Sequence, residues 1–311
     1  MDLVLRALLA NQGKFISGAQ IAEMVDLSRT AVWKRVQSLI ENGYGIDCIK
    51  KKGYRLHTLP KDRLIPEKLS LLCSHPLEFF YKPEIDSTNL WAKEVMVRYS
   101  ESSLFFTDKQ YAGKGRLGRQ WESAPGKDIA FSLGLRMNTD VCHYYQYTVL
   151  MALAVRNILA SSLQNEVKIK WPNDIYINNK KICGILTEMI TEENRLKTLI
   201  IGVGININSE PKLPQATSMK MVSGQEYDRH IILSEILNTF FKMREIMDTY
   251  GFSTLYEDWK KHLMGLFQSV RIDTGKYIVE GTLEDVNEQG IAVIRNGDHV
   301  EHVYSGDLFV S

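Results

Sequence analysis

Residues 168–205 read KIKWPNDIYINNKKICGILTEMITEENRLKTLIIGVGI, and the predicted architecture of the central part of the chain rests on them. Short runs rich in Val, Ile and Tyr alternate here with turn residues, among them Asn178-Asn179, which is typical of strands joined by tight turns. The predicted strands are 168–171, 175–177, 182–189 and 196–205. Because consecutive strands with such short connections pair with each other, we expect a mixed, partly antiparallel sheet with helices on one side.

Strand-like and helical runs continue on both sides of this stretch. Predicted strands cover 79–81 and 129–135, and predicted helices cover 87–96, 147–163, 229–250 and 254–263. Together these runs indicate an α+β domain over residues 66–267. Five short alternating runs then fill 268–311, with Asn296-Gly297 as a typical hairpin turn, and predict a small β-barrel.

The first 59 residues have a different pattern. Ser17 and Gln20 form a predicted capping box, and Ser28 begins a basic amphipathic helix. A strand, a turn at 50–53 and a returning strand follow, which is the order of a winged helix-turn-helix. We therefore predict a DNA-binding domain over 1–59, while a helical protein-interaction head is the alternative.

The helix that begins at Ser28 is expected to enter the major groove, and the lysines of the wing to contact phosphates. The predicted DNA-binding residues are Arg29, Thr30, Lys34, Arg35, Lys51 and Lys52. Trp33 can touch DNA or pack onto the small core, and packing is the expectation. One such domain offers few phosphate contacts, so we expect a dimer to read a two-part operator.

Charge and composition narrow the class of protein. Residues 1–58 hold nine Lys or Arg against five Asp or Glu, although the whole chain has a net charge of only +1, so a basic head precedes a mildly acidic body. Apolar stretches fall short of the ~20 residues that span a membrane, and the four cysteines form no Cys-x-x-Cys pair. We expect a cytoplasmic protein without membrane contact, zinc site or disulfide framework.

The segment 113–119, GKGRLGR, interleaves three glycines with three cations. Such a backbone can turn its N–H groups toward an anion, and the cations add positive charge around it. Neither a dinucleotide nor a P-loop fingerprint fits the spacing, so the loop binds a phosphate or carboxylate by another design.

Three further segments carry polar chemistry. DSTN at 86–89 begins a predicted helix, where hydroxyl and amide side chains would lie beside unpaired N–H groups. KWPND at 170–174 precedes KKICGI at 180–185, and GVGINI at 202–207 is a strand whose glycines leave room for a ligand. In this order, with QYAGKGR at 110–116, these motifs resemble those of the bacterial biotin protein ligases, and the N-terminal domain makes the bifunctional type the best match.

The resemblance covers the whole chain and implies its fold and reaction. It implies a class II aminoacyl-tRNA-synthetase-like central domain, an SH3-like C-terminal barrel, and a ligase that makes biotinyl-5′-AMP from biotin and ATP with Mg²⁺. Biotin would then pass to a lysine of a biotin carboxyl carrier protein. It also implies a homodimer that forms with biotinyl-AMP and represses biotin genes by binding operator DNA.

Site residues follow by the same resemblance. The implied biotin-binding residues are Ser87, Thr88, Asn89, Gln110, Lys114, Gly115, Arg116, Lys181, Gly184 and Ile185. The implied catalytic residues are Lys181, Arg116 and Arg119, and these three with Asn206 would bind the nucleotide, Asn206 also facing Mg²⁺. No tightly bound metal is expected.

The chain departs from the family pattern inside the glycine loop. Lys114 and Leu117 stand where arginines are usual, and a lysine cannot make a bidentate clamp on an anion. Asp174 has two interpretations: it orients Lys181 or the incoming amine, or it caps local backbone. Two other functions remain open, a lipoate or octanoate ligase and a ligand-sensing repressor without catalysis.

Overall fold

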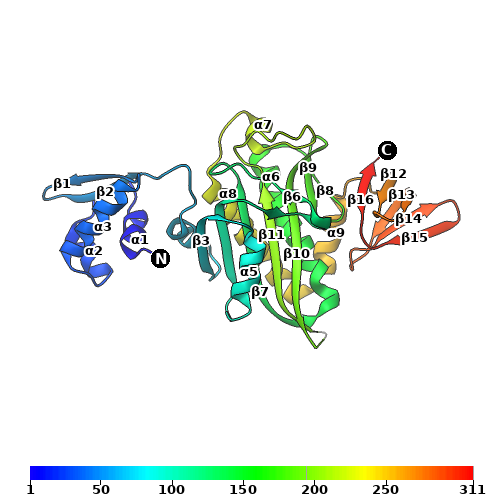
Figure 1. The fold of residues 1–311 in the computed structure, drawn as a ribbon, viewed down its shortest axis with the longest axis horizontal. Coiled ribbons are helices and arrows are strands. Elements are labelled where there is room, and N and C mark those ends of the chain that lie inside the picture. Colours follow the sequence, from blue (N-terminus) through cyan, green and yellow to red (C-terminus); the bar gives the residue numbers. More distant parts are fainter. Residues whose placement is uncertain (194, 311) are drawn as a thin grey trace. The chain divides into compact units, whose positions relative to one another are not determined.

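The computed structural model describes residues 1–193 and 195–310, and its chain divides into two compact units, Met1–Ser74 and His75–Ser311 (Figure 1). The architecture is the predicted α+β one, with a helix-turn-helix, a central mixed sheet and a C-terminal antiparallel sheet. The finer domain boundaries at 59, 66 and 267 stay predictions.

The first unit is a winged helix-turn-helix. Its elements are α1 (Leu3–Ala10), α2 (Gly18–Met24), α3 (Arg29–Glu41), β1 (Gly45–Ile49), β2 (Gly53–Thr58) and α4 (Pro66–Leu72). The Ser17–Gln20 capping box is present, and Ser28 accepts a hydrogen bond from the N–H of Ala31 at the start of α3. The two strands pair antiparallel, and a core of Leu8, Ile21, Val32 and Leu56 joins helices to wing.

A seven-stranded sheet forms the centre of the second unit. Its strands are β3 (Glu78–Ile85), β4 (Ser103–Gln110), β7 (Ile129–Asp140), β8 (Val167–Lys170), β9 (Asp174–Ile177), β10 (Lys180–Glu192) and β11 (Arg195–Ile205). Their spatial order is β3-β4-β7-β11-β10-β9-β8, and only β3 and β4 run parallel. Asn178 and Asn179 both have positive φ and turn β9 into β10, as predicted.

Helices cover both faces of this sheet, so the one-sided arrangement expected from sequence is wrong. The long helix α6 (Tyr144–Leu163) packs on one face, where the Thr148 and Thr187 hydroxyls lie 2.7 Å apart. Helix α5 (Thr88–Met96) lies on the other, because Gly202 and Gly134 leave the space that Asn89 and Met96 fill. Periodicity cannot decide this, since the choice of face depends on pairs distant in sequence.

The C-terminal part is a five-stranded antiparallel sheet with the order β15-β14-β13-β12-β16. Its strands are β12 (Ser269–Asp273), β13 (Ile278–Val286), β14 (Ala292–Asn296), β15 (His299–Val303) and β16 (Asp307–Val310). Buried Trp171 donates its indole N–H to the Gly290 carbonyl at 2.9 Å. Tyr145 donates to the Pro172 carbonyl and occupies the space beside Gly290, so the KWPND segment is fastened to this sheet.

The remaining elements are short or lie outside the sheets. They are β5 (Gly113–Lys114), η1 (Arg116–Gly118), β6 (Gln120–Trp121), η2 (Val141–His143), α7 (Met219–Ser223), α8 (Arg229–Tyr250) and α9 (Ser253–Lys261). Strands β5 and β6 pair with each other, so the glycine loop is a small hairpin. In the described part of the chain, no helix combines the length and apolar character that crossing a membrane requires.

Candidate active site

A cavity of about 800 Å³ opens on the α5 side of the central sheet. Its walls come from the start of α5, the glycine loop, the KWPND segment, the middle of β10 and β11, residues 209–216 and the start of β16. All the ligand-binding and catalytic residues predicted from the sequence line it: Ser87, Thr88, Asn89, Gln110, Lys114, Gly115, Arg116, Arg119, Lys181, Gly184, Ile185 and Asn206. Segments distant in sequence thus meet around one space.

One end of the cavity is a hydrogen-bonded polar cluster. Gln110 Oε1 accepts from the Thr88 N–H at 2.9 Å and from its hydroxyl at 3.2 Å. Ser132 Oγ lies 2.8 Å from Thr88 Oγ1 and 2.5 Å from Asn89 Oδ1. These side chains are fixed before any ligand arrives, which suits recognition of a small polar group.

Asn89 is held from its other side as well. Its amide Nδ2 donates to Glu188 at 2.8 Å, and Glu188 pairs with Lys93 one turn further along α5. The cap at the start of this helix differs from the expected one. Ser87 is buried but makes no capping hydrogen bond with its side chain, and the Gln110 side chain from β4 takes that role at Thr88.

Paired glycines form the floor of the cavity. Gly184 of β10 lies directly opposite Gly204 of β11, and the indole of Trp121 lies against both. A Cβ at Gly204 would collide with this indole. Trp121 Nε1 is buried without a hydrogen-bond partner among the described residues. Trp121 was not among the residues predicted from the sequence, although its position just after the glycine loop is a signal that points to the site.

Lys181 carries the cation at the centre of the site. Its Nζ lies 2.7 Å from Asp174 Oδ2, and it also lies over the Trp121 ring, 5.6 Å from the centroid. The Lys181 backbone is held by the segment that follows residue 209. Its N–H donates to the Gln215 carbonyl, and its carbonyl accepts from the Thr217 N–H. Asp174 therefore pairs with Lys181, and its role in orienting this side chain for the reaction stays a prediction.

The glycine loop turns sharply and reaches the C-terminal sheet. Leu117 and Gly118 both have positive φ, and the Gly115 N–H donates to the Arg119 carbonyl at 2.7 Å. Arg116 donates to Ser305 Oγ at 2.8 Å and to Asn173 Oδ1 at 3.3 Å. Arg119 donates to Asp307 Oδ1 at 3.0 Å, so residues outside the loop contact both arginine side chains, while Lys114 is exposed.

Another part of the cavity wall, which includes residues 122–125, is held by Asp128. One oxygen of this buried carboxylate accepts from the Ala124 N–H at 2.8 Å and the other from the Ile207 N–H at 2.9 Å. Burial raises the pKa of Asp128 above its ordinary value, against the lowering effect of these hydrogen bonds. Asp128 thereby joins the segment that follows the glycine loop to the end of β11.

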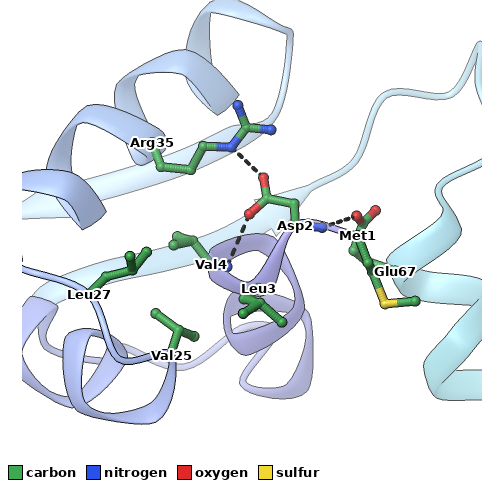
Figure 2. A pocket seen from close by; sticks show the side chains of 8 residues that line it. All are labelled: Met1, Asp2, Leu3, Val4, Val25, Leu27, Arg35 and Glu67. Carbon is green, nitrogen blue, oxygen red and sulfur yellow. Dashed lines mark hydrogen bonds and ion pairs between the residues drawn. The ribbon is translucent and has the colours of Figure 1, made fainter.

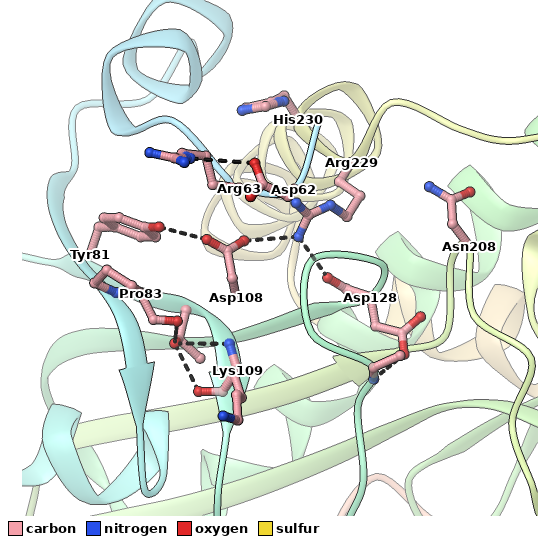
Figure 3. Close-up of polar contacts among 12 residues, drawn as sticks. Asp62, Arg63, Tyr81, Pro83, Asp108, Lys109, Asp128, Asn208, Arg229 and His230 are labelled. Carbon is pink, nitrogen blue, oxygen red and sulfur yellow. Dashed lines mark hydrogen bonds and ion pairs between the residues drawn. The ribbon is translucent and has the colours of Figure 1, made fainter. Parts of the chain in front are cut away.

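A second layer of charges supports this wall, as Figure 3 shows. Buried Arg229 at the start of α8 donates to Asp108 at 3.0 Å and to the Asp128 carbonyl at 3.1 Å, and Tyr81 donates to Asp108 at 2.6 Å. Because breaking a buried ion pair is costly, this network holds the start of α8 against β4 and against the segment that contains Asp128.

Asn206 lies in the cavity wall, and part of its side-chain amide already has a hydrogen-bond partner. Its side-chain N–H donates to the Thr217 carbonyl at 2.9 Å, which turns the amide and leaves its oxygen as the potential ligand. Among the described residues, no group of three or more His, Cys, Asp or Glu side chains is placed to hold a metal ion.

The predicted DNA-binding residues lie on the surface of the first unit. Arg29, Thr30, Lys34 and Arg35 of α3 are exposed, as are Lys51 and Lys52 at the wing turn. Trp33 is 52 % exposed on the same helix, so the expectation that it packs onto the core is wrong. The core between α3 and the wing is filled by aliphatic residues instead.

Arg35 differs from the other cations of α3 because it already has a partner. Figure 2 shows Asp2 between the two helices: its carboxylate lies 2.5 Å from Arg35 Nε, and it also accepts from the Val4 N–H at the start of α1. The Asp2 N–H donates to Glu67 at 2.5 Å. Arg35 is therefore less available to a phosphate than Lys34.

A winged helix-turn-helix joined to an α+β unit with this cavity defines a class of DNA-binding protein ligases. The model of the Biotin/lipoate A/B protein ligase family matches residues 81–206, and that of an HTH domain matches residues 2–55. The chain is 34 % identical to the bifunctional ligase/repressor BirA of Bacillus subtilis over 95 % of this chain and 94 % of that protein. It is 25 % identical to BirA of Escherichia coli over 99 % and 96 % of the two chains. The chain belongs to the bifunctional type of bacterial biotin protein ligase.

A solved structure shows the same likeness in three dimensions. The biotin protein ligase of Aquifex aeolicus in complex with biotin and ATP matches 75 % of this chain and 99 % of its own, with 26 % identity and a TM-score of 0.64.

Proposed function

We propose that this chain is a biotin protein ligase that joins biotin to AMP, transfers biotin to a lysine of a biotin carboxyl carrier protein, and represses transcription through its N-terminal unit. The observation that supports the enzyme most is the cavity itself, where Lys181 and Asp174 lie beside a floor of paired glycines. Membership of the family and the Aquifex ligase bound to biotin and ATP support the same substrates.

Biotin would bind with its ureido group at the polar cluster of Thr88, Asn89 and Gln110 and its rings against the Trp121 indole that covers Gly184 and Gly204. The two glycines leave room for the Trp121 indole, which supplies an apolar surface for the biotin rings. This pose directs the biotin carboxylate toward Lys181.

In adenylation, the carboxylate oxygen attacks the α-phosphorus of ATP and the bond to pyrophosphate breaks. Both reactants are anions, so the reaction needs positive charge that is oriented before they meet. Lys181, held by Asp174, and Arg116, held by Asn173 and Ser305, would supply it, with Arg119 nearby. Excluding water with the glycine loop would protect the mixed anhydride until a carrier lysine attacks its carbonyl carbon and AMP leaves.

Mg²⁺ bound with ATP would neutralise phosphate charge. Asn206 fits such an ion as a single amide oxygen ligand in the cavity wall, and the described residues offer no metal-binding cluster. An ion that takes most of its ligands from phosphates and water is typical of magnesium.

Biotin-dependent exchange of labelled pyrophosphate into ATP tests the enzyme, with lipoate and octanoate run as competing acids. We expect exchange in the presence of biotin and none with lipoate or octanoate in its place. Exchange that required lipoate or octanoate would favour the other ligase. Lys181→Ala is expected to lower exchange by about two orders of magnitude, because a charge at the reacting atoms is lost. A sensor without catalysis would show no exchange in the wild type.

The repressor function is supported by the exposed cations of α3 and the wing. We expect a cytoplasmic protein whose biotinyl-AMP complex forms a homodimer that binds operator DNA, while the carrier protein competes for the same ligase. Sedimentation with and without biotin and ATP tests this coupling. An unchanged fraction of dimer together with unchanged operator affinity would contradict it.

A further inference from the structure

Lys170, the last residue of β8, is a cation of the cavity that has no role in the proposed adenylation and transfer steps. It lines the cavity and is half-buried. Burial lowers its pKa, as do the neighbouring charges of Lys181 and Arg119, while Asp174 and Asp307 oppose the shift. A half-buried ammonium is costly unless something compensates its charge.

No carboxylate forms an ion pair with Lys170 among the residues that the structure describes. The acid opposite it across the β8–β9 pair is Asp174, but that carboxylate lies 2.7 Å from Lys181. The contacts of Lys170 are aromatic: its Nζ is 4.8 Å from the centroid of Tyr176 and 5.1 Å from that of Phe309. The Lys170 ammonium also donates a hydrogen bond to the neutral Tyr176 hydroxyl at 3.4 Å. Two rings hold the ammonium in place without neutralising it.

The sheet register places Lys170 in a row with the rest of the site. Gly204, Gly184, Asp174 and Lys170 lie opposite one another on β11, β10, β9 and β8. Neighbouring strands are about 4.8 Å apart, so the row extends about 14 Å from the glycine floor to Lys170. Along it come the glycines, the Lys181–Asp174 pair and then Lys170, which has no ion-pair partner among the described residues.

This order matches the order of groups in the reaction. In a displacement at phosphorus the attacking and leaving oxygens lie roughly in line on opposite sides of the phosphorus. With the biotin rings against the indole that covers these glycines and the α-phosphate near Lys181, the leaving group lies further along the row. We infer that Lys170 binds the β- and γ-phosphates of ATP and the pyrophosphate that departs, an assignment that rests on the proposed ligase function.

Two assays on the full-length protein separate this role from others. One measures biotinyl-AMP synthesis from biotin and ATP, with added inorganic pyrophosphate as inhibitor. The other measures biotin transfer to a carrier domain from chemically made biotinyl-AMP, which retains the α-phosphate but lacks the other two. Only a residue that serves the leaving phosphates affects the first assay alone.

For Lys170→Gln we expect kcat/KM for ATP to fall about ten- to a hundredfold and pyrophosphate to inhibit more weakly by a similar factor, the range for a lost charge-assisted hydrogen bond. Transfer from biotinyl-AMP should stay within about twofold of wild type, which also shows that the variant is folded. Lys170→Arg keeps the charge and should recover most of the synthesis. Lys168→Gln is the matched control, because Lys168 is on the same strand and face but outside the cavity.

Three results would overturn the assignment: unchanged synthesis in Lys170→Gln, an equal loss in synthesis and transfer, or unchanged inhibition by pyrophosphate. A wild-type protein inactive in both assays would instead contradict the proposed function, so the two failures are distinguishable.

Discussion

Arg119 of the glycine loop forms a two-point ion pair with Asp307 at the start of β16, with Nη1 3.0 Å from Oδ1 and Nη2 bonded to Oδ2. The hydrogen bond from Arg119 lowers the pKa of Asp307 and raises that of Arg119. The pair joins residues that are far apart in the sequence, so the C-terminal sheet holds the loop that the ligand must use.

Replacing Asp307 with Ala should loosen the loop in the absence of ligand. Exposed pairs contribute at most about 1 kcal/mol, so we expect Tm to change little while trypsin cleaves after Arg116 or Arg119 a few times faster. Limited proteolysis with mass spectrometry measures this. Asp298→Asn, at an exposed turn of the same sheet, is the control. Equal cleavage of all three proteins would show that the Arg119–Asp307 pair does not hold the loop.

The glycine floor gives a prediction about size. A methyl group at Gly204 would collide with the Trp121 indole, so Gly204→Ala should displace the ring and weaken biotin binding by at least about tenfold. Calorimetric titration with biotin measures the affinity. At Gly115 the new Cβ would meet only Arg119, at an ordinary distance of 3.4 Å or more, so Gly115→Ala should cost much less. Equal losses of affinity in both variants would contradict a specific role of the Gly204–Trp121 contact in the site.

Asp128 predicts a dependence of stability on pH. Because its pKa in the folded protein is above the unfolded value, the wild type should lose stability relative to Asp128→Asn as pH rises from about 4 through the folded-state pKa, then show a constant difference. The difference in Tm between the two proteins at several pH values between 4 and 7 measures this. A difference in Tm that instead grows in favour of the wild type as pH rises would contradict a raised pKa of Asp128.

For the N-terminal unit, Lys34 and Arg35 should differ in their contribution to DNA binding. Lys34→Gln is expected to reduce the slope of log K against log salt by about 0.9 for a random-sequence duplex, as one phosphate contact is lost. Arg35→Gln should reduce it less, since Asp2 already neutralises Arg35. Fluorescence anisotropy over a salt series gives both slopes, and a larger effect at Arg35 would argue against the pairing.

The local elements of the fold were largely predictable from the sequence. The capping box at Ser17, the Asn178-Asn179 turn and the strands around KWPND agree with the structure to within a few residues. These features depend on backbone preferences and on side-chain spacing within one element, which a single segment encodes. The motifs that resemble the biotin ligases also supplied predicted residues that all line the cavity, although Trp121, which lines it too, was not among them.

The arrangement of those elements came only from the tertiary structure. That α5 crosses to the face opposite α6, that Trp121 lies on Gly184 and Gly204, and that Asp307 holds Arg119 depend on contacts between distant segments. The same holds for Lys170, whose lack of a carboxylate partner among the described residues follows from the strand register and from Asp174 turning to Lys181. Sequence determines which groups are available through local preference, whereas packing determines which charges are neutralised and which remain for a substrate.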